Sequence, residues 1–391
     1  MEDPKPAGSA GSSGVLAAAA AEADPRKRTA FEALIAGSKG SDGGIKSAKQ
    51  AKSETALREG DTRLEVILQA TPGAKGLDAF ACFVISKGRP DNVPEINKLF
   101  GDSGVKPTWI VGPGEVDLYL AKGAAAAIEG GGLCASRNKA IELAGAAGKM
   151  CVQMSDDINQ VKILHQEEAW AKPADLTAGN ALAKSVEHLA VSPAMAARFL
   201  EAHMSKAGAR LGGAYPTANE GQAMLCDVLS TDLFIVGDFL VVDPTAAPRF
   251  DEKMSLKEDY DFTAQHLHQY ATVARCNRCM VKATHYTNAG GAVADRNDAR
   301  EQYNIGVLRY KWPGVFPQHG TRGENEVRMA WGGRGTLLGG SKNVPRPAAP
   351  PGYLEAGGLA AAAPPATKKT SILSFFKAQP KVPATDLSKA R

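Results

Sequence analysis

The sequence lacks the features that would place it in a membrane or outside the cell. It contains no secretory signal, and the Ala-rich stretch from Val15 to Ala21 is too short to span a bilayer and is followed by acidic residues. Its six cysteines are scattered, as expected for free thiols in a reducing compartment. We therefore expect a protein with no membrane partner.

A second cysteine pair is also missing. Cys276 and Cys279 form a lone C-x-x-C, whereas a structural zinc site needs two further ligands at a recognisable spacing. We interpret these two residues as core or surface thiols.

Both ends of the chain contain few large apolar residues. Ala, Gly, Ser and Lys dominate residues 1–70, and Pro, Ala and Gly dominate from about residue 340. Such segments bury too little apolar surface to offset the entropy of folding, so we predict disordered tails over 1–70 and 340–391. Residues 75–335 have ordinary apolar content, which is enough for one large domain.

The predicted domain has no positive charge excess. Residues 341–391 hold eight basic and two acidic residues, a net charge of +6, and residues 1–60 hold nine and eight, a net charge of +1. Since the whole chain carries +4, residues 61–340 carry −3. Any nucleic-acid contact must therefore come from a local patch or from the tails. The basic run Arg26–Lys27–Arg28 is either a nuclear import signal or part of a solvated arm.

Apolar runs alternate with helical patterns in the first half of this domain. We predict strands over 79–86, 107–111 and 149–154, with helices ending at Phe100 and covering 135–147. The alternation predicts an α/β fold with parallel strands, whose carboxyl ends are the usual ligand-binding edge. In the second half we predict helices over 177–189, 193–207, 259–270 and 298–308, and strands over 233–242, 272–275 and 280–286.

Two polar groups in the first half have residue types that suit phosphate and metal chemistry. Asp156 and Asp157 end the third strand, where they would either bind a hard divalent cation or cap a turn. Arg137 and Asn138 open a helix after a glycine run, and they would either bind phosphate or lie on an ordinary surface.

Two groups in the second half are candidates for proton transfer and metal binding. Glu258 and Asp259 stand among further charged residues, so one of them has the crowding that raises a carboxyl pKa and suits a general base. The alternative is an acidic helix start, which the helix dipole favours. His285 follows a predicted strand and is either a metal ligand or a satisfied polar residue.

The order of these groups resembles the nucleotide-sugar glycosyltransferases of the GT-A fold, most closely the TET-associated glycosyltransferase family, which is predicted to act beside DNA-base oxygenases. The segments that carry the resemblance are Phe83-Val84-Ile85-Ser86-Lys87-Gly88-Arg89-Pro90, Ser136-Arg137-Asn138-Lys139-Ala140, Gln153-Met154-Ser155-Asp156-Asp157, Gly237-Asp238, Lys257-Glu258-Asp259-Tyr260-Asp261 and His285-Tyr286-Thr287-Asn288. The resemblance implies a GT-A-like fold over 75–335 with a mostly parallel central sheet. It also implies a nucleotide-sugar donor such as UDP-glucose and a divalent cation, Mn²⁺ or Mg²⁺.

The resemblance also implies a role for each candidate residue. The donor side would use Arg89, Arg137 and Asn138, the metal side Asp157, Asp156 and His285, and catalysis Asp259 with Glu258. The sequence departs from the family at Ser155, which stands where the first Asp of the D-x-D motif is expected.

The C-terminal tail contains an apolar cluster over 369–376. Ile372, Phe375 and Phe376 have the spacing of one tight turn, and a disordered tail has no core in which to bury them. The cluster resembles the PIP box that binds the sliding clamp PCNA, with Lys369 in place of the usual Gln. The alternative is a chance apolar cluster.

Together these features predict a nuclear glycosyltransferase that acts on hydroxylated bases in DNA and is recruited to PCNA. A base in duplex DNA would have to be flipped out of the stack. Two alternatives remain: a chromatin protein as the acceptor, or a catalytically inactive, clamp-tethered binding module, which the departure at Ser155 favours.

Overall fold

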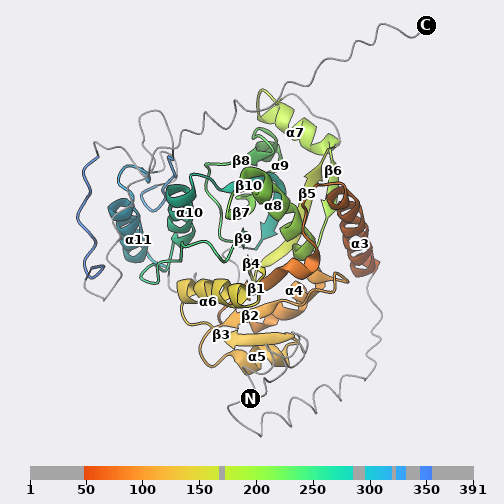
Figure 1. The fold of residues 1–391 in the computed structure, drawn as a ribbon, viewed down its shortest axis with the longest axis horizontal. Helices are drawn as coiled ribbons and strands as arrows, with labels where there is room; N and C mark the ends of the chain where they lie inside the picture. Colours follow the sequence, from red (N-terminus) through yellow and green to blue (C-terminus); the bar gives the residue numbers. More distant parts are fainter. Residues whose placement is uncertain (1–47, 167–171, 285–295, 319–322, 332–343, 355–391) are drawn as a thin grey trace, which may run out of the picture. The chain divides into compact units, whose positions relative to one another are not determined.

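Parallel strands form the first half of the sheet. The computed structural model describes residues 48–166, 172–284, 296–318, 323–331 and 344–354 (Figure 1). Strand β1 (Phe80–Ile85) pairs in parallel with β2 (Thr108–Val111) and β4 (Met150–Ser155), and β2 pairs in parallel with β3 (Ala126–Glu129). The predicted strands over 79–86, 107–111 and 149–154 are confirmed. An unbroken apolar run suits β1 because it has a strand on each side and a core on each face.

The second half of the sheet is mainly antiparallel. Strand β9 (Phe239–Val242) runs antiparallel to β4 and to β7 (Leu211–Tyr215). Strand β10 (Ala274–Ala283) is parallel to β7 and antiparallel to both β5 (Ile158–His165) and β8 (Leu229–Ser230), and β5 is antiparallel to β6 (Glu187–Ala190). The described residues thus form a ten-stranded mixed sheet with the order β3-β2-β1-β4-β9-β7-β10-β5-β6, and β8 beside β10. The α/β class is confirmed, but the prediction of a mostly parallel sheet is wrong, because the sequence did not reveal β5, β6 and β7.

Helices cover both faces of the sheet. Their bounds are α3 (Ala48–Gln69), α4 (Val93–Phe100), α5 (Val116–Ala121), α6 (Leu133–Ala146), α7 (Leu176–Ser185), α8 (Pro193–Ala207), α9 (Glu220–Met224), α10 (Glu258–Tyr270) and α11 (Asp298–Lys311). Each face of the sheet has its own hydrophobic core, and adjacent residues of β1 belong to different cores. Val84 packs in the core with α3, α4 and α8, whereas Phe83 packs in the core with α6, α10 and α11. A smaller cluster lies under α7 and α9.

Helix α8 has the bounds that its sequence predicts. Ser192 accepts a hydrogen bond from the Met195 N–H, Pro193 occupies the first turn, and Gly208 ends the helix with a φ of 64°. These are local signals, so the boundaries could be predicted without knowledge of the tertiary packing.

Helix α3 lies in the segment predicted to be a disordered tail. Leu64 and Leu68 are spaced by one turn and are buried in the core, and Glu65 forms an ion pair with Arg198 of α8. Gly60 allows the close approach, because a Cβ there would lie 1.8 Å from the Ala190 carbonyl oxygen. The predicted tail boundary at residue 70 is therefore wrong. The short apolar stripe was not recognised because charged, polar and small residues make up most of this helix.

Residues 344–354 also differ from the predicted tail. Pro350 contacts α11 at Gly306, where a Cβ would lie 2.8 Å from its ring, and the guanidinium of Arg346 lies 5.3 Å from the ring centre of Tyr310. Tyr353 donates a hydrogen bond to Asp251. The predicted tail from residue 340 thus includes a segment bound to the domain, while the motif over 369–376 lies outside the described residues.

Three smaller predictions in the second half need correction. The strand expected over 233–242 begins only at Phe239, and the helix expected over 177–189 ends at Ser185, before β6. The two strands expected over 272–275 and 280–286 are one strand, β10, whose pairing with β7 is irregular between Cys276 and Met280.

Candidate functional site

Polar side chains gather where β1 and β4 end. Ser86 follows β1 and donates a 2.5 Å hydrogen bond to Asp156, which follows β4. Arg89 forms a 3.0 Å ion pair with the other Asp156 oxygen, and its backbone N–H donates to the Tyr119 hydroxyl. Burial raises the pKa of Asp156, although Ser86 and Arg89 favour its charged form. The structure thus brings together the predicted donor residue Arg89 and the predicted metal ligand Asp156, but as partners of each other.

Asp157 lies where three strands meet. The Thr284 N–H, just beyond β10, donates a 3.0 Å hydrogen bond to the Asp157 carbonyl oxygen. On the other side, the Ser155 N–H donates to the Asp238 carbonyl oxygen, just before β9. His285, the predicted late metal ligand, lies outside the described residues.

Arg137 is buried in the middle of the site. From α6 its guanidinium donates to the Gly237 carbonyl oxygen at 3.1 Å and lies 3.3 Å from the Glu258 carboxylate. It also donates weakly to Gln153 at 3.4 Å and stacks on the Phe250 ring. This buried guanidinium offsets part of the negative charge of Glu258. Arg137, which the sequence predicts to bind the nucleotide-sugar donor, is therefore paired within the protein in this structure.

Asp259 is a carboxyl group whose pKa is shifted toward neutral pH. One carboxylate oxygen accepts from the Gly237 N–H at 3.0 Å and the other from the Tyr260 N–H at 2.9 Å. The residue is partly exposed, but protein atoms surround its carboxyl group, and this burial, together with the charge of Glu258, raises the pKa of Asp259 to about 7. At neutral pH such a group can both accept and release a proton.

Gly237 joins Arg137 to Asp259. Its carbonyl oxygen binds the guanidinium while its N–H binds the carboxylate, and a Cβ at this position would lie 2.7 Å from Arg137. Any side chain at this position would therefore displace the Arg137 guanidinium. Helix α10 begins beside it from Lys257, a non-glycine residue with a φ of 57°. This left-handed conformation is a local strain next to the candidate site.

Asn138 has a different position from the one expected. Its amide donates to the Phe250 carbonyl oxygen and accepts from the Phe250 N–H, at 2.9 and 2.8 Å, and it also donates to Glu252. These contacts fix the loop that leads to α10, so Asn138 positions Asp259 indirectly rather than facing the site.

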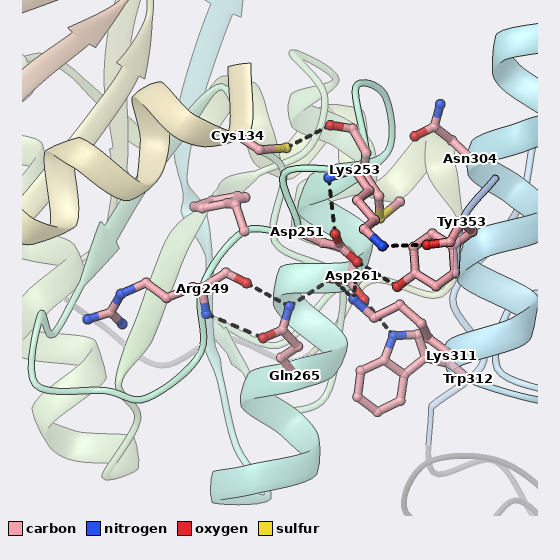
Figure 2. Close-up of polar contacts among 12 residues, drawn as sticks. Cys134, Arg249, Asp251, Lys253, Asp261, Gln265, Asn304, Lys311, Trp312 and Tyr353 are labelled. Carbon is pink, nitrogen blue, oxygen red and sulfur yellow. Dashed lines mark hydrogen bonds and ion pairs between the residues drawn. The ribbon is translucent and has the colours of Figure 1, made fainter. Parts of the chain in front are cut away.

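The sequence did not reveal a second ionic group beside this loop. Figure 2 shows Lys311 between Asp251 and Asp261, with Tyr353, Trp312 and Gln265 around them. Lys311 lies 2.9 Å from Asp251 and 2.7 Å from Asp261, while Tyr353 donates to Asp251 at 2.7 Å. We call Lys311, Asp251, Asp261 and Tyr353 the Lys311 network. Only Asp261 stood in a segment with a sequence signal.

Metal ligands are sparse in the described part of the chain. No group of three His, Cys, Asp or Glu side chains with metal-site geometry occurs there. Cys276 and Cys279 are buried in the core, and burial raises the pKa of the Cys276 thiol to about 11. Both are core thiols in this fold.

The described helices do not include one with the length and apolar character needed to cross a bilayer. Comparisons of the chain with protein-family models, with curated proteins and with solved structures find no match.

Proposed function

We propose that this protein is a nucleotide-sugar-dependent glycosyltransferase with a GT-A-like fold that acts on hydroxylated bases in DNA. The observation that carries the proposal is the convergence of Asp157, Arg137 and Asp259 beside the carboxyl end of β4. Glycosyl transfer to a hydroxyl group needs residues that stabilise the negative charge of the leaving diphosphate and a group that accepts the hydroxyl proton. Arg137 and Asp157 suit the first role, and Asp259, with a pKa of about 7, suits the second.

In the proposed reaction the acceptor hydroxyl oxygen bonds to the anomeric carbon of the sugar while the bond to the diphosphate breaks. Asp259 accepts the hydroxyl proton. The nucleoside diphosphate leaves with new negative charge, which Arg137 stabilises once its contacts with Glu258 and Gly237 rearrange around the donor.

The residues at the end of β4 fit a divalent cation held largely by substrate. Asp156 is engaged by Arg89, which leaves Asp157 as the carboxylate for this role, and Mg²⁺ is commonly held by one or two carboxylates plus phosphate oxygens. A bound cation would stabilise charge on the diphosphate. His285 lies outside the described residues, so its role as a second ligand rests on the resemblance alone.

A thermal-shift measurement with UDP-glucose, with and without Mn²⁺, tests the donor and the metal together. A donor at one hundred times its Kd should stabilise the fold by about 2.7 kcal/mol. Asp157→Ala should abolish the Mn²⁺-dependent part and leave the melting temperature without ligand unchanged or higher, because it relieves crowding with Asp156. Full donor turnover by Asp157→Ala would remove Asp157 from the metal role.

Two observations favour a second candidate, a catalytically inactive binding module. Arg137 and Asp156 are both paired within the protein, and the described residues contain no three-ligand metal cluster. Hydrolysis of the donor by the purified protein separates the two candidates, because a binding module would retain the donor intact.

The proposed recruitment to PCNA rests on Ile372, Phe375 and Phe376 in the C-terminal tail. A peptide over 367–381 should bind the clamp, and the double substitution Phe375→Ala with Phe376→Ala should abolish binding, because aromatic anchors carry most of such an interface. Equal binding by the double variant would reduce the motif to a chance cluster, and the core assignment would stand independently of it.

A further inference from the structure

A cavity of about 220 Å³, lined by none of the residues assigned above, lies on the side of the sheet that carries α7 and α9. Its lining comes from β5, β10 and the start of α9, which Figure 1 labels close to one another. The strand register explains its shape: Gln160 pairs with Lys282 and Lys162 pairs with Met280. These four side chains therefore point to one face of the sheet, with Met280 as a buried apolar floor.

The cavity carries a net positive charge. Lys162 forms an ion pair with Glu220 on the opposite wall, so these two charges largely cancel. Lys282 is exposed and forms no ion pair within the described part of the chain, and Gln160 is exposed beside it. One free ammonium group and one amide donor thus remain for a ligand, in a segment, residues 61–340, that carries a net charge of −3.

The cavity is also close to the candidate site along the chain. Strand β5 begins at Ile158, directly after Asp157, and Ile158 pairs with Ala283, directly before Thr284. Lys282 therefore lies two residues before Thr284 and Gln160 three residues after Asp157, about 7 and 10 Å along a strand from the contact between those two residues. The cavity therefore borders the end of the sheet at which the candidate site lies.

We propose that this cavity is a phosphate-binding subsite for the sugar–phosphate backbone of the acceptor DNA. This inference rests on the proposed function, because that function is what makes DNA the acceptor. The volume is below the roughly 300–1,000 Å³ of pockets for drug-sized ligands, which suits a single sugar–phosphate unit. The Lys282 ammonium binds the phosphate, the Gln160 amide donates a second hydrogen bond, and Met280 contacts the sugar.

Lys282 and Glu220 carry opposite charges, so neutralising each of them should change the affinity for DNA in opposite directions. Lys282→Gln removes the free cation, and we expect the affinity for a single-stranded oligonucleotide to fall roughly tenfold at low salt. The slope of log affinity against log salt should become shallower by about 0.7, the value for one phosphate contact on a single strand. Glu220→Gln frees Lys162 and should strengthen binding.

The matched control is Lys106→Gln, which makes the same charge change at an exposed lysine before β2, at the other end of the strands. All variants are measured in the full chain, so the basic tail contributes equally to each. Salt slopes that are equal for wild type, Lys282→Gln and Lys106→Gln would overturn the subsite, as would weaker binding by Glu220→Gln.

Competitors identify the ligand chemistry. Inorganic phosphate should compete for the Lys282-dependent part of binding, whereas polyglutamate should not. Equal, Lys282-dependent binding of polyglutamate would assign the cavity to acidic protein segments and overturn the phosphate assignment. The binding assay contains no sugar donor, and sugar transfer is measured separately. Lys282-dependent DNA binding by a protein that transfers no sugar would contradict only the proposed function. Transfer to DNA that is equally fast in wild type and Lys282→Gln would contradict only the subsite.

Discussion

The first turn of α10 holds two aspartates with different hydrogen-bond partners. Asp261 belongs to the Lys311 network, where Lys311, Trp312 and Gln265 donate to its carboxylate. Asp259, two residues earlier and on another side of the helix, receives only two backbone N–H groups, while the nearby Arg137 pairs with Glu258. The same residue type on the same turn is therefore held by a lysine, a tryptophan and a glutamine in one place and by backbone N–H groups in the other.

Asp251, the other carboxylate of the Lys311 network, and Asp259 have pKa values shifted in opposite directions. Burial opposes ionisation of Asp251 in the Lys311 network, but Lys311 and Tyr353 outweigh it and lower the pKa of that carboxyl. Burial also opposes the charge of Lys311, and the two carboxylates outweigh it and raise its pKa. At Asp259 nothing outweighs burial and the charge of Glu258, so the pKa of Asp259 rises to about 7. The direct pairing with Lys311 thus lowers the pKa of Asp251, whereas Asp259, which has no such partner among the described residues, keeps a raised pKa.

The largest effect we expect is on sugar transfer in Asp259→Asn. The variant keeps the shape of the side chain but loses the proton acceptor, so transfer to hydroxymethylated DNA should fall by roughly a hundredfold to ten-thousandfold. Donor affinity should persist, because Arg137 and Asp157 carry it. Glu258→Gln, which changes the neighbouring carboxylate in the same way, should have a smaller effect, since adjacent helical residues point in different directions. Normal transfer with normal donor affinity in Asp259→Asn would refute the assignment.

The next effect is on stability, in Lys311→Met. This change leaves Asp251 and Asp261 buried without their cation, and breaking such a pair costs about 3–5 kcal/mol. The melting temperature should fall by about 10 °C, at the 2–4 °C per kcal/mol typical of larger domains. Lys106→Met, at an exposed lysine, should stay within about 0.5 kcal/mol of wild type. A melting temperature for Lys311→Met equal to that of this control would show that the network contributes nothing.

Sequence reasoning found the elements whose signals are local. The apolar run of β1 and the Ser192 cap and Gly208 stop of α8 were predictable, as was the start of α10. Strand β7 was not, because its Leu-Gly-Gly-Ala-Tyr sequence contains two glycines. A Cβ at Gly212 would lie 2.5 Å from Met204, so close packing under α8, rather than strand propensity, explains the residue.

The candidate site was predictable only as a set of separate pieces. Arg89, Arg137, Asp157 and Asp259 were identified from residue type and order, and the structure brings them to one end of the sheet. The sequence could not show that Gly237 links two of them or that Asn138 holds the Phe250 loop. Contacts between residues a hundred positions apart depend on the tertiary fold, which no local pattern encodes.

The smallest effect we expect is the pH dependence of stability that Asp259 causes. It tests directly whether Asp259 differs from the paired carboxylates of the Lys311 network. Below the ordinary aspartate pKa of 3.8, Asp259 is protonated in the folded and unfolded states. Between about pH 4 and 7 the folded state retains a proton that the unfolded state has lost, so the free energy of unfolding falls as pH rises. The slope is at most about 1.4 kcal/mol per pH unit.

Asp259→Asn should remove this slope, so the difference in unfolding free energy between wild type and variant should change between pH 4 and 7 and be constant above it. Denaturant titrations across pH 4 to 8 measure that difference. Asp251→Asn is the control with the opposite sign: because the folded pKa of Asp251 is lowered, its stabilisation is present above pH 3.8 and is lost only at more acidic pH. Sugar transfer by the wild type should rise with pH and level off above about 7, where Asp259 is ionised. A difference curve for Asp259→Asn that is flat from pH 4 to 7 would place Asp259 with the paired carboxylates, and the contrast between the two aspartates would be lost.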